Sequence, residues 1–330
     1  MLHQWEGMPE GLLECAAPEL YRILEGPTLV HLPGRAGRPL FLSVLLHGNE
    51  DSGWEAARRL LARRDRALPR PVSIFIGNVA AARHRLRRLE GQADYNRIWS
   101  AGHSAEHAMA AQVMDTMAER GVFASIDIHN NTGRNPHYGC INRLDHRFVH
   151  LATLFSRTVV YFIRPDTVQS MGFSRICPAT TVECGKPGRE EATAHALEFI
   201  EAALNLDHFP GHPVPAHDYD LFHTVATVTI PEEVTFGFGP DTDLQLLPDL
   251  DELNFQELPA GTVFAYTGSE QGRLDVRDEA SNDVAGRYFE AQQGVVRTRV
   301  PVMPSMLTGD ERVIRQDCLC YLMERMPTLD

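Results

Sequence analysis

The amino-acid sequence predicts an α/β fold, in which a mixed, mostly parallel sheet is flanked by helices and followed by a smaller β-rich domain. Two observations support this prediction. Up to about Asn205, apolar runs of strand length alternate with segments whose apolar residues recur at helical spacing. Beyond that point the chain consists of short alternating runs separated by turn residues. We therefore predict two domains, residues 1–205 and 206–330.

The first strands and helix of the predicted sheet follow each other closely. "RPLFLSVLLHG" (38–48) is a continuous apolar run ended by His-Gly, which is typical of a strand buried on both faces. "DSGWEAARRLLARR" (51–64) follows with apolar residues at helical spacing, and its Asp51 occupies a capping position. "PVSIFIGN" (71–78) predicts a second buried strand. A long polar segment then extends to His103.

The alternation continues through the rest of the first domain. "AEHAMAAQVMDTMAER" (105–120) predicts an amphipathic helix, and "ASIDIHN" (124–130) predicts the third strand. "RTVVYFI" (157–163) and "PATTVECG" (178–185) predict two more strands, and "REEATAHALEFIEAALN" (189–205) predicts another helix. Strands separated by helices are typical of a parallel sheet.

The sequence pattern of the second domain differs from that of the first. "FPGHPVPAHDYD" (209–220) is rich in Pro and His and lacks periodicity, so we interpret it as a linker. The runs "TVATVTI" (224–230), "TVFAYTG" (262–268) and "GVVRTRVPV" (294–302) alternate in the manner of strands. Because no amphipathic helix of useful length follows the linker, we predict a β-rich domain.

Composition and charge exclude several classes of function. The chain has 330 residues, 43% of them hydrophobic and 23% charged, which is typical of a globular protein. A formal net charge of -13 argues against a nucleic-acid partner, which would require Lys and Arg on one face. The sequence has no signal peptide and no apolar run long enough to span a membrane, so we expect a cytoplasmic protein without a membrane partner. It leaves the oligomeric state open, a homo-oligomer included.

Polar residues suited to metal binding cluster at the predicted strand ends. His47 and Glu50 follow the first strand, His129 ends the third, and Glu183 lies near the end of the strand in 178–185. In an open parallel sheet, ligands bind beyond the carboxyl ends of the strands, so these side chains can converge on one crevice. Each residue taken alone is more often structural. Together they indicate a shared site.

The residue types in this set match a catalytic zinc site. Such a site takes three protein ligands from His, Asp or Glu and keeps one position open for water. His47, Glu50 and His129 form a His₂Glu set of this kind, and Glu183 can then act as general base toward that water. Asp127 points to the same face of its strand as His129, so it can orient that ligand or form a structural salt bridge.

Four sequence motifs occur in an order that narrows the interpretation. They are "HGNEDSG", "RRLEGQADYNRIW", "DIHNNTG" and "TVECG", and together they span roughly residues 40 to 190. In this order they resemble the motifs of the succinylglutamate desuccinylase/aspartoacylase family, a branch of the zinc carboxypeptidase-like enzymes. The resemblance implies a zinc carboxypeptidase-like α/β fold, and the β-rich remainder is compatible with the C-terminal domain of these deacylases.

The resemblance also implies a role for each site residue. The ligands of one Zn²⁺ per chain would be His47, Glu50 and His129, and Glu183 would be the general base and later the proton donor. Arg88 would polarise the scissile carbonyl and stabilise the oxyanion, although the adjacent Arg87 is an alternative for this role. Two further residues, Asn96 and Arg97, would grip a carboxylate of the substrate.

Three functions remain compatible with these residues. The leading prediction is hydrolysis of the amide bond in a small N-acyl amino acid that carries a free carboxylate. The first alternative is a zinc carboxypeptidase that acts on short peptides or cell-wall fragments, because the Asn96/Arg97 clamp would serve both substrates. The second is a non-catalytic zinc-binding protein, against which Glu183 argues, since a pure binder needs no base beside the metal.

Overall fold

The structure is a computed structural model, and it describes residues 1–63, 67–269 and 271–329. It confirms the predicted α/β fold, with a large, mostly parallel sheet flanked by helices and a separate β-rich sheet. Within the described ranges, no helix combines the length and apolar character that crossing a membrane requires.

The chain forms two compact units. The first comprises Met1–Asn130 and His137–Leu221, with a short contribution from the end of the chain. The second comprises Phe222–Met326 together with the six-residue segment Asn131–Pro136. The second unit therefore includes the loop Asn131–Pro136, which directly follows the third predicted strand.

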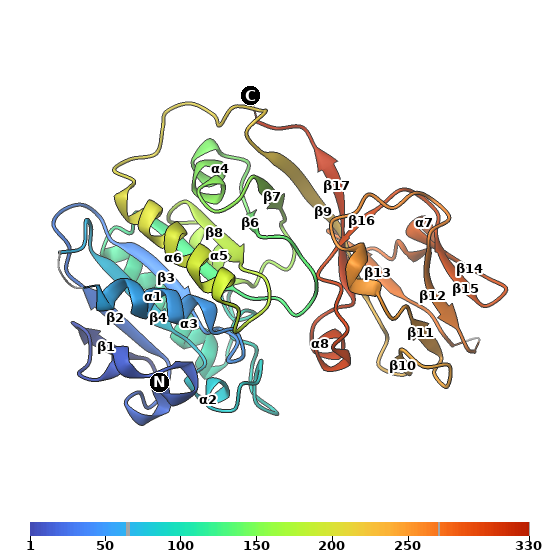
Figure 1. The fold of residues 1–330 in the computed structure, drawn as a ribbon, viewed down its shortest axis with the longest axis horizontal. Helices are drawn as coiled ribbons and strands as arrows, with labels where there is room; N and C mark the ends of the chain where they lie inside the picture. Colours follow the sequence, from blue (N-terminus) through green and yellow to red (C-terminus); the bar gives the residue numbers. More distant parts are fainter. Residues whose placement is uncertain (64–66, 270, 330) are drawn as a thin grey trace. The chain divides into compact units, whose positions relative to one another are not determined.

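The sheet of the first unit has the order β1-β2-β4-β3-β5-β8-β6-β7 (Figure 1). The pairs β3/β4, β3/β5 and β5/β8 are parallel, whereas β2/β4 and β6/β8 are antiparallel. The strands are β1 (His3–Glu6), β2 (Thr28–Leu32), β3 (Leu40–Val44), β4 (Val72–Ile76), β5 (Ala124–His129), β6 (Tyr138–Ile141), β7 (Thr158–Tyr161) and β8 (Ala179–Glu183).

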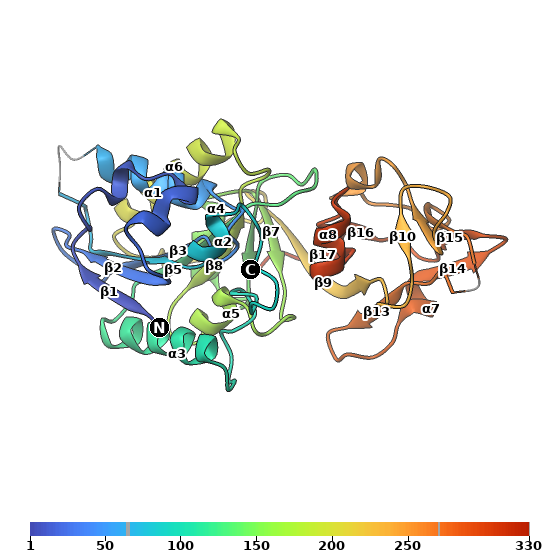
Figure 2. The same cartoon turned by 90° about the horizontal axis from the view of Figure 1, so that it is seen from below.

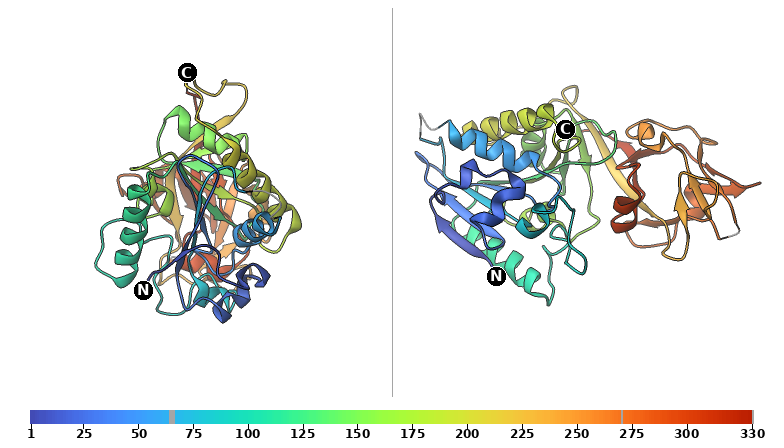
Figure 3. Two further views of the ribbon diagram at one scale, coloured as in Figure 1. Left: turned by 90° about the vertical axis from the view of Figure 1, so that its left-hand side faces the viewer. Right: turned by 60° about the horizontal axis from the view of Figure 1, so that its bottom comes forward.

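Helices cover both faces of this sheet, with α1 and α6 on one side and α3 and α5 on the other (Figure 2). Helices α1 and α6 lie side by side (Figure 3). The helices are α1 (Ser52–Ala62), α2 (Val79–Ala82), α3 (Ala105–Glu119), α4 (His146–Thr153), α5 (Gln169–Phe173) and α6 (Glu190–Asn205), with 3-10 turns at Leu12–Glu14 and Ala17–Arg22.

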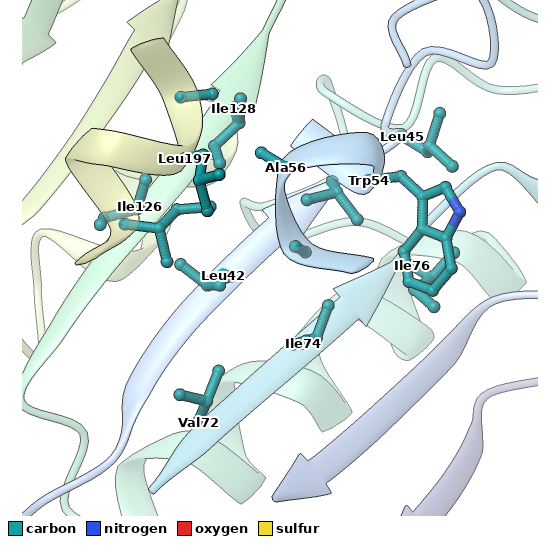
Figure 4. Packing of buried hydrophobic residues seen from close by; sticks show 14 of the residues in the cluster. Leu42, Leu45, Trp54, Ala56, Val72, Ile74, Ile76, Ile126, Ile128 and Leu197 are labelled. Atoms are coloured by element: carbon teal, nitrogen blue, oxygen red, sulfur yellow. The ribbon is translucent and has the colours of Figure 1, made fainter. Parts of the chain in front are cut away.

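Successive side chains along the central strands β3 and β5 point to opposite faces of the sheet. Every second residue of β3 and β5, such as Leu42 and Ile126, packs into the apolar cluster beneath α1 and α6 (Figure 4). The intervening residues face the other helices, so Phe41 of β3 stacks on Phe173 of α5 with ring centroids 4.3 Å apart. Because Asp127 is out of phase with Ile126, it faces the side of α3 and α5.

Three details differ from the prediction made for the first strand and helix. The strand ends at Val44, three residues before His47, because Leu45 adopts a left-handed conformation with φ 57°. Asp51 precedes α1, but its carboxylate accepts a hydrogen bond from Gly188 N at 3.1 Å, and its side chain forms no bond within the helix. Helix α1 ends at Ala62, and the last residue of the predicted helix, 64, lies outside the described residues.

The second unit is built from short strands around its own apolar cluster. Strand β9 (Asp220–Thr229) pairs with β13 (Asp275–Asp278), and β16 (Met303–Ser305) pairs with β17 (Cys320–Met326). A separate five-stranded sheet has the order β10-β11-β12-β15-β14. Its strands are β10 (Phe236–Gly237), β11 (Leu244–Leu246), β12 (Val263–Thr267), β14 (Phe289–Gln292) and β15 (Val295–Thr298). The helical segments are the 3-10 turn Leu250–Leu253, α7 (Ala285–Tyr288) and α8 (Glu311–Gln316).

Candidate metal centre

The loop between β3 and α1 brings two of the predicted ligands to the carboxyl edge of the sheet. After Leu45 the chain turns sharply, and Glu50 N donates to His47 O at 3.2 Å, which closes a tight turn. His47 is 3% exposed and Glu50 is 6% exposed. The third predicted ligand, His129, is the last residue of β5, the strand directly beside β3 (Figure 1).

Two glycines in this segment are explained by close packing. A Cβ at Gly48 would lie 2.2 Å from Ala82 N, because the backbone of α2 passes directly against the loop. A Cβ at Gly53 would lie 3.0 Å from side-chain atoms of Ile128 and Val44, because the first turn of α1 rests on the sheet. Gly48 therefore allows the His47–Glu50 loop to pack against α2, and Gly53 allows α1 to pack against the sheet.

The side chains of the three predicted ligands converge. His47 Nδ1 lies 2.8 Å from Glu50 Oε1, and His129 Nδ1 lies 2.7 Å from Glu50 Oε2. One ligand atom from each of the three residues lies within 4.8 Å of the others, and all three residues are buried. The two imidazoles thus present the same nitrogen toward one carboxylate.

The Nε2 atom of each imidazole, on the side of the ring away from Glu50, contacts a second carboxylate. His47 Nε2 lies 3.1 Å from Asp94 Oδ1, and His129 Nε2 lies 2.8 Å from Asp127 Oδ2. A carboxylate that accepts the Nε2–H of a histidine leaves its Nδ1 lone pair available for a metal. Asp127 is therefore in a position to orient His129, as well as to form a salt bridge with it, and Asp94 has the corresponding position behind His47.

The charges of these groups shift one another's pKa values. Burial alone would raise the pKa of Glu50, but the facing imidazoles of His47 and His129 hold it well below its usual range. Burial would lower the pKa of His129, yet Asp127 and Glu50 raise it well above its usual value. The neighbouring carboxylates therefore favour protonated imidazoles at His47 and His129, and metal binding would have to compete with these protons.

Glu183 ends β8, the strand that neighbours β5. In the parallel register its partner is His129, so both residues lie at the same sheet edge. Glu183 is 8% exposed. Burial and the Glu183 carboxylate raise the pKa of the nearby Cys140 and Cys184 thiols, so neither is suited to act as a nucleophile.

The two adjacent arginines have different partners. Arg87 donates to Asp94 Oδ2 at 3.1 Å, and its side chain is 10% exposed. Arg88 donates to the backbone oxygen of Gln92 at 2.9 Å. The Gln92 side chain in turn pairs its amide with that of Asn78, which holds the loop in place. Arg87 thus supports the Asp94–His47 pair, whereas Arg88 is bonded only to a neutral carbonyl in these contacts.

The predicted carboxylate clamp lies beside His129. Asn96 Nδ2 is 3.3 Å from His129 Nε2, and Asn96 Oδ1 accepts a hydrogen bond from Gln169 N at 3.0 Å. Arg97 donates to the backbone oxygen of Asn96 at 3.0 Å and is partly exposed. The structure therefore brings Asn96 into the ligand cluster, and it leaves part of the Arg97 side chain accessible to solvent.

Two residues of the centre were not anticipated from the sequence. Asp94 lies two positions before Asn96 in the motif "RRLEGQADYNRIW". Its position in this motif was the sequence feature that could have predicted its place in the site. Asn130 binds Glu50 Oε2 through its backbone N at 3.2 Å, and its side chain bonds Ser52 and the Gly185 oxygen. Asn130 follows His129 in the "DIHNNTG" motif, and this position was the available signal.

The donor set fits zinc. Two histidine nitrogens and one carboxylate converge, and both histidines are backed by carboxylates of the kind that accompany zinc-bound imidazoles. A zinc ion held by three protein ligands keeps a coordination position for water or substrate, as in catalytic sites, whereas closed structural sites have four protein ligands.

Comparison with known proteins places this architecture among solved structures. No protein-family model and no curated protein sequence matches the chain. The succinylglutamate desuccinylase of Chromobacterium violaceum is 19% identical with a TM-score of 0.56, over 89% of this chain and 87% of that one. A succinylglutamate desuccinylase/aspartoacylase from Rhodobacter sphaeroides is 14% identical with a TM-score of 0.58, over 90% and 89% of the two chains. Murine aminoacylase 3 is 14% identical with a TM-score of 0.55, over 89% and 97%.

These similarities concern the fold. The solved structures include members of the family that the four motifs resemble, so the fold expected from that resemblance is confirmed. At identities of 14–19%, the shared fold by itself assigns no reaction.

Proposed function

We propose that the chain is a zinc-dependent hydrolase that cleaves the amide bond of a small N-acyl amino acid with a free carboxylate. The observation that carries the proposal is the buried His47–Glu50–His129 cluster, with Glu183 at the neighbouring strand end. The names of the solved structures that share the fold, desuccinylase, aspartoacylase and aminoacylase, denote enzymes that remove acyl groups, which supports this class of substrate.

The cluster would hold one zinc ion per chain. When bound, zinc supplies a Lewis acid and makes a coordinated water more acidic. The role of His47, Glu50 and His129 is to fix its position, and Asp94 and Asp127 keep the two imidazoles in the required orientation.

Glu183 would carry the proton in both halves of the reaction. As a carboxylate it accepts a proton from the attacking water, and as a carboxylic acid it delivers that proton to the leaving amine nitrogen. Arg88 would donate to the carbonyl oxygen as negative charge develops on it. The contact between Arg87 and Asp94 favours Arg88 for this role, because the Arg87 guanidinium already serves the carboxylate behind His47.

Asn96 and Arg97 would bind the free carboxylate of the substrate. Arg97 is suited to this task because a guanidinium offers two parallel donors to a carboxylate and keeps its charge at any physiological pH. Asn96 is held by Gln169 beside His129, which would place the bound carboxylate at a constant distance from the reacting bond.

The proposal is tested with the zinc-loaded protein and two sets of substrates. We expect release of free amine from N-acyl amino acids and little release from dipeptides with a free C-terminus. Faster cleavage of dipeptides would identify a carboxypeptidase instead, and the absence of both activities would indicate a zinc-binding protein without turnover.

The variant Glu183→Gln separates chemistry from binding. It keeps the size of the side chain but cannot accept a proton, so kcat should fall by about a hundredfold to ten-thousandfold with zinc content and KM nearly unchanged. Glu198→Gln, a change of the same kind on the exposed side of α6, serves as the control and should leave kcat unaltered. Near-normal kcat in Glu183→Gln would refute the assigned mechanism.

A further inference from the structure

A pocket of the first unit lies at the opposite edge of the sheet from the candidate metal centre. It has a volume of about 650 Å³, and its lining includes Arg38, Phe123 and Pro178. These residues precede β3, β5 and β8, whereas the metal centre follows the carboxyl ends of the same strands. Because the three strands are parallel, the two sites are separated by the length of a strand, on the order of 17 Å.

Arginine is the dominant charged residue of this pocket. Its lining contains one carboxylate, Asp207, against five arginines, although the whole chain has a net charge of -13. The arginines are Arg38, Arg70, Arg143, Arg147 and Arg175. Such a local excess of positive charge in an acidic protein favours an anionic ligand.

Two of the five arginines serve the protein itself. Arg70 is 6% exposed and donates to backbone oxygens around the end of α6, including Leu204 O at 3.3 Å, and its guanidinium lies 3.7 Å from the ring centre of Phe123. Arg147 is bound by the carboxylate of Asp145, with N–O distances of 3.0 and 2.8 Å. These two residues shape the wall of the pocket and add to its positive potential.

The other three arginines keep donors available. Arg143 uses one nitrogen to bond Ser174 O at 3.2 Å. Arg38 and Arg175 are exposed, and across the described parts of the chain neither forms an ion pair with a carboxylate. They come from three different segments, before β3, after β6 and after α5, and all three line the pocket.

We propose that this pocket binds a small phosphorylated molecule, whose phosphate groups contact Arg38, Arg143 and Arg175. A phosphate carries up to two negative charges and directs acceptor oxygens in several directions, so one phosphate can bond more than one guanidinium group. A single carboxylate is planar and carries one charge, and it would satisfy one of the three. The volume of the pocket also falls within the range of roughly 300–1,000 Å³ that small-molecule sites occupy.

The proposal is tested by calorimetric titration of the full-length, zinc-loaded protein with pyrophosphate at fixed ionic strength. We expect saturable binding, weakened about a hundredfold in Arg38→Gln/Arg175→Gln, because each of the two charge-assisted hydrogen bonds lost costs about a factor of ten. The control, Arg297→Gln/Arg299→Gln, removes the same charge from the second unit, where each arginine bonds one backbone oxygen, and its affinity should change less than about twofold.

Other outcomes of this titration would overturn the proposal. Absence of binding at millimolar pyrophosphate would do so, as would an equal loss in the two double variants. Unchanged binding in Arg38→Gln/Arg175→Gln would place the pyrophosphate elsewhere, the metal centre included. Citrate binding as tightly as pyrophosphate would refute the preference for phosphate. Should the double variant unfold, the single change Arg143→Gln gives the same test with about a tenfold loss.

Discussion

Replacing Asp127 by Asn removes one negative charge from the metal centre without changing the volume of the side chain. Asp127 is fully buried on β5, and its Oδ2 lies 2.8 Å from His129 Nε2. In the variant an amide oxygen can still accept the Nε2–H, but it makes the imidazole a weaker donor to the metal. The amide nitrogen would take the place of Oδ1, which has no hydrogen-bond partner among the described residues.

The expected cost follows from this contact. Loss of a carboxylate behind a metal-bound histidine typically weakens metal affinity about 10- to 100-fold, which corresponds to roughly 1.4–2.7 kcal/mol. We therefore expect Asp127→Asn to bind zinc about 10- to 100-fold more weakly in competition with a chromogenic chelator.

A matched variant separates this effect from a general loss of stability. Asp145→Asn alters an aspartate at the start of α4 whose carboxylate bonds Arg147, so it should lower the melting temperature slightly and leave zinc affinity unchanged. Zinc affinity of Asp127→Asn within about twofold of the unaltered protein would refute the orienting role of this carboxylate.

Three further predictions concern packing, anchoring and pH. Gly48→Ala should lower the free energy of unfolding in urea by at least about 2 kcal/mol, because the new Cβ would lie 2.2 Å from the α2 backbone. The control Gly211→Ala has open space around it and should be neutral. Equal effects of the two changes would contradict the packing argument. Arg70→Met should lower the free energy of unfolding by about 2–4 kcal/mol, because it removes the donor to Leu204 O at the end of α6 and the donor to Arg38 O before β3. A loss below about 1 kcal/mol would contradict this anchoring role. Zinc affinity should fall as the pH decreases, because protons compete with zinc for the histidine nitrogens. The fall should begin above the ordinary histidine pKa of about 6.5, because neighbouring carboxylates raise the pKa of His47 and His129. A constant affinity between pH 6.5 and 8 would contradict this prediction.

The strand ends of the first unit were predictable because buried parallel strands leave a strong apolar pattern. "LFLSV" is a nearly uninterrupted apolar run, so the positions of His47 and Glu50 beyond it could be inferred. "ASIDIH" places an apolar residue at every second position and ends at His129. Their mutual approach could not be inferred from spacing alone, because it depends on the left-handed turn at Leu45 and on the close passage of α2 against Gly48.

The remaining differences arise from tertiary contacts that a local pattern does not contain. Asp51 has the residue type and position of a helix cap, yet Gly188, far along the chain, takes its carboxylate. β6 has four residues and pairs antiparallel with β8, so it is too short for alternation to reveal it. Arg87 and Arg88 are neighbours of the same type, and only their partners in the folded chain distinguish them.

The most direct test of the metal centre is the zinc content of the purified protein and of one ligand variant. Elemental analysis after dialysis against metal-free buffer should find about one zinc per chain, and His129→Ala should lose most of it, because two ligands rarely retain zinc at a catalytic site. His150→Ala, which alters a histidine on α4, is the control and should keep the full amount. Unchanged zinc content in His129→Ala would contradict the assignment of His47, Glu50 and His129 as the metal ligands.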